Sequence, residues 1–320
     1  MNKTKSIYTL SIIAIILALV PYLMGSSTLA EHNDSRKKEY SIPDVPKEIT
    51  FAGERIAFDR YDKREKMDRE LISFCFMHTN SHLIIKRANR YFPIIEPILK
   101  ENNIPDDLKY LMVIESSMNP FARSVAGAAG FWQFMPATGR EYGLEVNKNI
   151  DERYHIEKST VAACKYLKDA YAKFGDWISA TASYNAGQGR ISTELQKQGV
   201  DDASELWLVE ETARYIYRLL AAKLFFQNPQ QFGFYLKKEQ LYPPLEYSEY
   251  ITTTGITNLS TFAKQQGITL ALLKDFNPWL RETSLENRSG RTYKLKIPTQ
   301  KGLSYNPKDI VPYNKNWVIH

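Results

Sequence analysis

Cysteine is scarce in this sequence, and its scarcity limits what the chain can be. The 320 residues contain two cysteines, Cys75 and Cys164. Neither lies at a spacing typical of metal ligands, which disfavours a metal enzyme. Both fall on apolar stripes of expected helices, so we expect buried thiols. A disulfide between them in an oxidising compartment is the alternative.

A segregated block of positive charge is also missing. The net charge is +6 at pH 7, and lysine and arginine alternate with aspartate and glutamate almost throughout the chain. Such a balance suits either a polyanionic partner or an ordinary basic surface, but it lacks the clustered basic face of a nucleic-acid binder. We therefore expect no nucleic-acid partner. Low-complexity tracts and long internal repeats are absent too, and the hydrophobic fraction of 43% is enough for one or two folded domains.

The N-terminus contains an uncharged apolar run. Lys3 and Lys5 precede residues 7–24, IYTLSIIAIILALVPYLM. A basic start before such a run is typical of an export signal or a membrane anchor, and this run is long enough to span a bilayer. The two lysines favour a cytoplasmic N-terminus. We expect an exported protein of the cell envelope or periplasm, with cleavage of the segment and retention in the membrane both open.

The rest of the chain divides by its residue pattern. Apolar residues at helical spacing run from about residue 65 to residue 226, with few recognisable strands. After Pro243 and Pro244 the pattern changes to a strand, two short helices and a closing strand. We expect a mainly α protein with these parts: a signal or anchor at 1–30, a polar spacer and N-terminal extension at 31–64, a helical domain at 65–235, a small β-α-α-β module at 245–300 and a tail at 301–320.

Glu115 stands where a buried apolar residue is expected. Leu108, Leu111 and Met112 form the apolar stripe of a helix, and Glu115 is the next position on it, shortly before Asn119-Pro120. A charge on a buried face is costly unless it is paired, hydrogen-bonded or protonated. The alternative is a helix end whose glutamate turns out to solvent.

The segment after Glu115 is rich in small residues. Residues 116–130 contain many serines, alanines and glycines, and Phe131, Trp132 and Gln133 follow. Small residues let a ligand approach the backbone, and an aromatic face beside an amide suits a sugar ring that carries an N-acetyl group. The alternative is a tight turn between packed helices.

Four motifs occur in order along the chain: E-S-x-x-N-P at 115–120, A-x-S-x-x-G-A-x-G-x-W-Q-F-M-P-x-T at 122–138, Y-N-A-G-x-G at 184–189 and E-T-x-x-Y at 211–215. This set resembles the family 1 lytic transglycosylases, which have a goose-lysozyme-like catalytic domain, and most of all the membrane-bound lytic murein transglycosylase D type. Met118 replaces a usual aromatic residue, and Ser183 a usual alanine. Neither change removes a reactive group.

The resemblance implies a lysozyme-like helical fold and a single catalytic acid/base, Glu115. It implies that the substrate is held by Ser124, Gln133, Tyr184, Asn185, Glu211 and Tyr215. The reaction would cut the β-1,4 bond between N-acetylmuramic acid and N-acetylglucosamine in peptidoglycan strands. The substrate's C6 hydroxyl would close a 1,6-anhydro ring, so no second carboxylate would be needed. Burial that raises the pKa of Glu115 would keep it protonated at neutral pH.

Residues 250–298 are similar to a LysM peptidoglycan-binding module, with Gly255-Ile256-Thr257 in place of the usual Gly-Asp-Thr. A degenerate LysM module and a purely structural extension both remain open. For the whole chain, a lysozyme-like hydrolase and an inactive peptidoglycan-binding protein are the alternatives to a transglycosylase. We expect a monomer with no cofactor and no metal.

Overall fold

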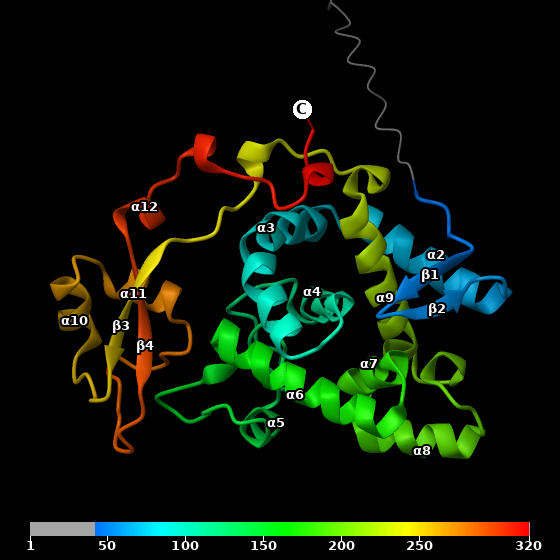
Figure 1. Cartoon of the computed structure of the whole chain (residues 1–320), viewed down its shortest axis with the longest axis horizontal. Helices are drawn as coiled ribbons and strands as arrows, with labels where there is room; N and C mark the ends of the chain where they lie inside the picture. Colours follow the sequence, from blue (N-terminus) through cyan, green and yellow to red (C-terminus); the bar gives the residue numbers. More distant parts are fainter. Residues whose placement is uncertain (1–41, 320) are drawn as a thin grey trace, which may run out of the picture. The chain divides into compact units, whose positions relative to one another are not determined.

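The computed structural model describes residues 42–319 (Figure 1). The apolar run at residues 7–24, predicted to be a signal or an anchor, lies outside the described residues. Within residues 42–319, every helix is too short or too polar to cross a bilayer.

The described chain begins with a hairpin that the sequence pattern did not predict. Strands β1 (Glu48–Phe51) and β2 (Glu54–Ala57) pair antiparallel, with Ile49 opposite Ile56. Ala52 and Gly53 make the turn with positive φ angles of 53° and 87°. Phe51 is fully buried, so the second half of the expected spacer at 31–64 contains folded chain that contributes to the core.

The predicted helical region is confirmed. Its helices are α2 (Tyr61–Phe76), α3 (His78–Glu101), α4 (Tyr110–Ser116), α5 (Pro136–Glu141), α6 (Ile156–Phe174), α7 (Trp177–Ala186), α8 (Gln188–Gln198) and α9 (Glu210–Gln227). Residues with clear capping chemistry set two of the boundaries. Asp176 accepts a hydrogen bond from the backbone of Ser179 at the start of α7, and Gly175 ends α6 with a φ of 81°.

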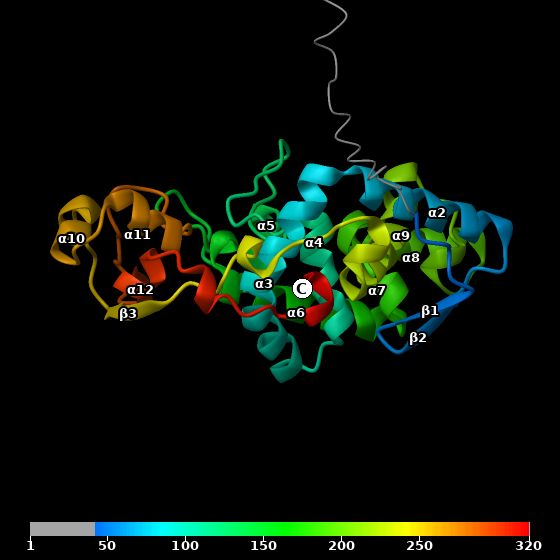
Figure 2. The ribbon, with the colours of Figure 1, turned by 90° about the horizontal axis from the view of Figure 1, so that it is seen from above.

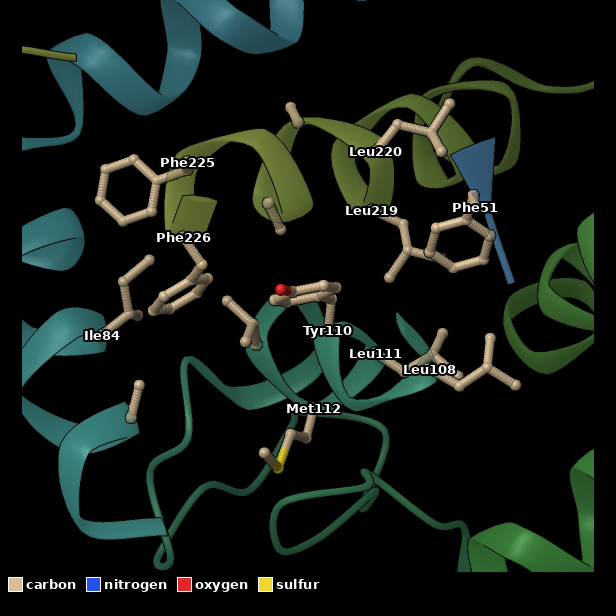
Figure 3. Packing of buried hydrophobic residues seen from close by; sticks show 14 of the residues in the cluster. Phe51, Ile84, Leu108, Tyr110, Leu111, Met112, Leu219, Leu220, Phe225 and Phe226 are labelled. Atoms are coloured by element: carbon tan, nitrogen blue, oxygen red, sulfur yellow. The ribbon is translucent and has the colours of Figure 1, made fainter. Parts of the chain in front are cut away.

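Helix α9 is the packing partner of three helices, α2, α4 and α7. Tyr110 of α4 faces Leu219 and Phe226 of α9 in the main core (Figure 3). The rings of Tyr110 and Phe226 stack there with centroids 5.7 Å apart. Leu108, Leu111 and Met112 are fully buried, which confirms the predicted apolar stripe.

The C-terminal module has the predicted order of elements. Strand β3 (Tyr247–Thr252) pairs antiparallel with β4 (Tyr293–Pro298), and α10 (Leu259–Gln265) and α11 (Leu270–Phe276) lie between them in sequence. These elements group together in two perpendicular views (Figures 1 and 2). The module is not a separate unit, because its core also includes Ala129, Ile150 and Tyr154 from the helical domain.

The segment after β4 returns to the helical domain. A short helix, α12 (Gln300–Leu303), is followed by irregular chain that ends on the main core. Trp317 is 1% exposed, and its indole Nε1–H donates to the carbonyl of Phe226 at 2.7 Å. The expected tail at 301–320 thus provides a core residue for the end of α9.

We predict that Trp317→Ala lowers the free energy of unfolding by about 3 to 5 kcal/mol, since it removes a buried indole and leaves a cavity. Urea unfolding followed by circular dichroism measures this change. Trp207→Ala is the matched control, because Trp207 is 88% exposed. Equal stability of the two variants would contradict the role assigned to Trp317.

Candidate active site

Glu115 lies in the last turn of α4, where the helix ends abruptly. Ser117 and Met118 both adopt left-handed backbone conformations with φ of 52°. The guanidinium of Arg87 donates to the carbonyl of Ser117 at 2.9 Å, which stabilises this unusual helix end. Met118 is fully buried, so it still packs in the core although it replaces a usual aromatic.

The carboxyl of Glu115 is partly buried and is bonded to Tyr215 of α9. The Tyr215 hydroxyl donates to Glu115 Oε1 at 2.5 Å, and the ring of Tyr215 is buried. Burial raises the pKa of Glu115 to about 7, while the Tyr215 bond and the charge of Arg218 oppose the shift and Glu211 adds to it. The glutamate therefore sits on the buried face, and the alternative of a solvent-directed side chain is wrong.

Tyr184 and Asn185 lie at the end of α7, and Tyr184 is close enough to Glu115 to feel its charge. The Tyr184 hydroxyl donates to the carbonyl of Trp132 at 2.8 Å, which joins α7 to the loop after α4. Burial first, and then the charge of Glu115, raises the pKa of Tyr184 well above its ordinary value. Asn185 Oδ1 accepts a hydrogen bond from the Thr212 hydroxyl of α9 at 3.0 Å.

Ser124 and Gln133 form hydrogen bonds within the loop between α4 and α5. The Ser124 hydroxyl accepts from the backbone of Ala128 at 3.0 Å. The Gln133 amide donates to the carbonyl of Gly130 at 2.7 Å, and Gln133 has a positive φ of 47°. Both predicted site residues therefore shape the loop, and their bonds do not reach Glu115.

The expectation of a sugar-facing aromatic surface at Phe131 and Trp132 is wrong. Both side chains are buried, and the Trp132 indole donates to the Thr160 hydroxyl at 2.9 Å. The exposed large apolar side chains on this loop belong to Phe121, Val125 and Met135. Burial of these two rings removes a large apolar area from water, which stabilises the fold.

Residues 42–319 contain no group of three or more histidine, cysteine or acidic side chains that would hold a metal ion. His78 and His82 stand four residues apart on α3, a spacing that suits two metal ligands. Their rings pack instead against Phe234, with centroid distances of 5.9 and 4.9 Å.

Cys164 is a buried free thiol, so the alternative of a disulfide with Cys75 is wrong.

Sequence reasoning missed two arginines. Arg218 follows Tyr215 by three residues on α9, and helical spacing from Glu211 and Tyr215 would have placed it on the same face. Arg153 is buried under the loop that carries Gln133 and bonds to two of its carbonyls. No local pattern indicates this second arginine, since its partners are distant in sequence.

Comparison with protein-family models identifies both parts of the chain. Residues 92–206 match the transglycosylase SLT domain, and residues 249–301 match the soluble lytic transglycosylase C-terminal LysM-like domain. The fold is therefore a lysozyme-like helical SLT domain followed by a small LysM-like module, as predicted.

Two curated relatives of the chain are lytic murein transglycosylases. Membrane-bound lytic murein transglycosylase D of Escherichia coli (strain K12) is 30% identical over 238 residues, which is 72% of this chain and 50% of the relative. The chain is homologous to that protein and spans about half of its length. The soluble lytic murein transglycosylase of Salmonella typhimurium is 31% identical over 131 residues, 37% of this chain and 20% of the relative.

Among solved structures, the 70 kDa soluble lytic transglycosylase of Escherichia coli aligns with a TM-score of 0.38 at 24% identity. The alignment covers 43% of this chain and 24% of that one.

We predict that Gly130→Ala destabilises the protein by about 2 to 4 kcal/mol, through a backbone clash added to a strained φ. A Cβ at Gly130, whose φ is 76°, would lie 1.9 Å from the carbonyl oxygen of Arg153. Gly127→Ala, with a φ of 92° and open space around its Cβ, separates strain from clash and should cost only about 1 to 2 kcal/mol. Thermal unfolding compares the two, and equal losses would refute the clash.

Proposed function

We propose that this protein is a peptidoglycan lytic transglycosylase in which Glu115 acts first as an acid and then as a base. The observation that carries the proposal is a partly buried carboxyl within the SLT match, with its pKa raised to about 7 and a hydroxyl donor at 2.5 Å. A group with that pKa is protonated in much of the population at neutral pH. It also accepts a proton back readily once it has lost its own.

In the proposed reaction, Glu115 donates its proton to the oxygen between N-acetylmuramic acid and N-acetylglucosamine. The bond from C1 of the muramic sugar to that oxygen breaks, and the carbonyl oxygen of the sugar's own N-acetyl group stabilises the positive charge at C1. The Glu115 carboxylate next removes the proton of the C6 hydroxyl. The C6 oxygen bonds to C1, which closes a 1,6-anhydro ring and restores protonated Glu115 without consuming water.

Tyr215 supports both states of Glu115 in this scheme. Its hydroxyl donates to the carboxylate that forms when the proton leaves, and it holds the carboxyl in one orientation. Glu211 is exposed at the first turn of α9 and helps to keep the Glu115 proton in place. We assign the substrate contacts to Ser124, Gln133, Tyr184, Asn185, Glu211 and Tyr215.

We also infer that the protein works in the cell envelope as a monomer on peptidoglycan strands. The uncharged run at residues 7–24 favours export, with or without retention in the membrane. The name of the relative from Escherichia coli, a membrane-bound murein enzyme, supports the same location.

We predict that Glu115→Gln abolishes release of 1,6-anhydro-muropeptides from purified sacculi while the fold survives. The amide cannot donate a proton of comparable acidity, so the rate should fall by at least about a hundredfold. Mass spectrometry measures the products, and circular dichroism checks the fold. Glu210→Gln is the matched control, because Glu210 is exposed on the same helix as Tyr215 and pairs with Arg69.

Product masses also separate the competing functions. A lysozyme-like hydrolase, with Glu211 activating a water molecule, would release reducing ends heavier by one water than anhydro ends. An inactive binding protein would retain sacculi and release nothing. Full activity of Glu115→Gln would remove the basis of the proposed mechanism.

We predict that kcat/KM of the wild-type protein falls above about pH 7, because the acid form of Glu115 is lost there. Tyr215→Phe should move this limb to higher pH, since the Tyr215 bond lowers the pKa of Glu115 and its removal lets burial act unopposed. The maximum rate should fall as well. A pH–rate profile on soluble glycan measures both effects.

Tyr217→Phe is the control for Tyr215→Phe. Tyr217 is buried on the same helix, and its hydroxyl lacks a hydrogen-bond partner within the described part of the chain. The pH–rate profile of this variant should match the wild type. A shift of the Tyr215→Phe limb to lower pH would contradict the assigned sign.

A further inference from the structure

Arg153 is buried between the loop that carries Gln133 and residues 149–151, which contact the C-terminal module. Its Nε and Nη2 donate to the two carboxylate oxygens of Asp151 at 2.9 and 2.6 Å. Its Nη1 donates to the carbonyls of Gly127 and Phe134 at 2.7 and 2.9 Å. The Arg153 side chain is only 6% exposed, so water has little access to replace its hydrogen bonds if they are lost.

The two carbonyls that Arg153 binds, of Gly127 and Phe134, lie before and after Gly130 and Gln133 in the sequence. The carbonyl oxygen of Arg153 itself lies against Gly130, at a position that only a glycine leaves free. Gln133 holds a positive φ of 47°, a conformation that persists only where the surroundings impose it. Arg153 therefore bonds to the loop both before and after Gln133, the residue with the positive φ.

The partner of Arg153 is bound to the C-terminal module. The backbone N–H of Asp151 donates to the carbonyl of Trp279 at 2.9 Å. Two residues earlier, the Asn149 side chain makes a two-bond clamp: its Nδ2 donates to the carbonyl of Ser284, and its Oδ1 accepts from the backbone of Glu286, both at 2.9 Å. Ile150, between these two residues, is buried in the core of the module.

We propose that Arg153 is a positioning residue for the loop at 122–134, and that the LysM-like module holds Arg153 in place through Asn149 and Asp151. The connection runs from the module to Asp151, from Asp151 to Arg153, and from Arg153 to the loop at 122–134. The module thus contributes to bond cleavage even when it binds no glycan. This inference rests on the proposed function, since loop position matters through the substrate that the loop contacts.

The test uses the full chain with Asn149→Ala and Arg153→Lys. Asn149→Ala removes the clamp at a distance from the loop and leaves Arg153 intact. Arg153→Lys keeps the charge, but an ammonium group cannot reproduce the planar fork that joins one carboxylate to two carbonyls. Asn258→Ala is the matched control, because Asn258 caps α10 within the module by accepting from the backbone of Thr261.

Two measurements are made on each variant. One is kcat and KM on a soluble, uncross-linked glycan oligomer, and the other is amide hydrogen exchange across residues 122–134 without substrate. We expect faster exchange in this loop and a kcat lowered about tenfold or more for both test variants, with a smaller change in KM. Asn258→Ala should retain wild-type values of both.

Wild-type loop exchange and kcat in Asn149→Ala would overturn the proposal. Losses of the same size in Asn258→Ala would also overturn it, since they would reflect module stability alone. Failure of the proposed function is a distinct result: the wild-type protein would then release no anhydro product, while the exchange measurement would still report on the link between module and loop.

Discussion

The packing of α4 against α9 brings Glu115 and Tyr215 together, and the site depends on that contact. The two helices meet through the main core, where the stacked rings of Tyr110 and Phe226 lie one helix turn or more from the carboxyl. This packing partly buries the end of α4, and the burial raises the pKa of Glu115 to about 7. The hydrophobic contact between α4 and α9 thereby determines the pKa of Glu115.

The opposing influences on Glu115 explain why its pKa lies near neutrality and not higher. Burial is the largest influence that raises the pKa of Glu115, and the negative charge of Glu211 adds a smaller increase. The Tyr215 hydroxyl and the positive charge of Arg218 favour the carboxylate. In the role proposed for Glu115, an acid that gives up a proton and then takes one back works best when neither form is strongly preferred.

The small module is connected to the loop at 122–134 by polar contacts through residues 149–153 and by a shared core. Ala129, on the loop, and Ile150 both pack with the module, and Asn149 clamps its backbone. A flexible tether would lack such contacts, whereas here the loop and the module share a core and the module is held by hydrogen bonds. The return of Trp317 to the main core adds a second attachment.

Local patterns in the sequence determined the helices, the β-α-α-β order of the module and the position of Glu115 on a buried stripe, because apolar spacing and capping residues act over a few positions. They did not reveal the hairpin at 48–57 or the burial of Trp132. Only the tertiary structure decided the Tyr215 bond, the opposing charge of Arg218 and the place of Arg153. Those contacts join residues far apart in the chain, and long-range packing determines which of them meet.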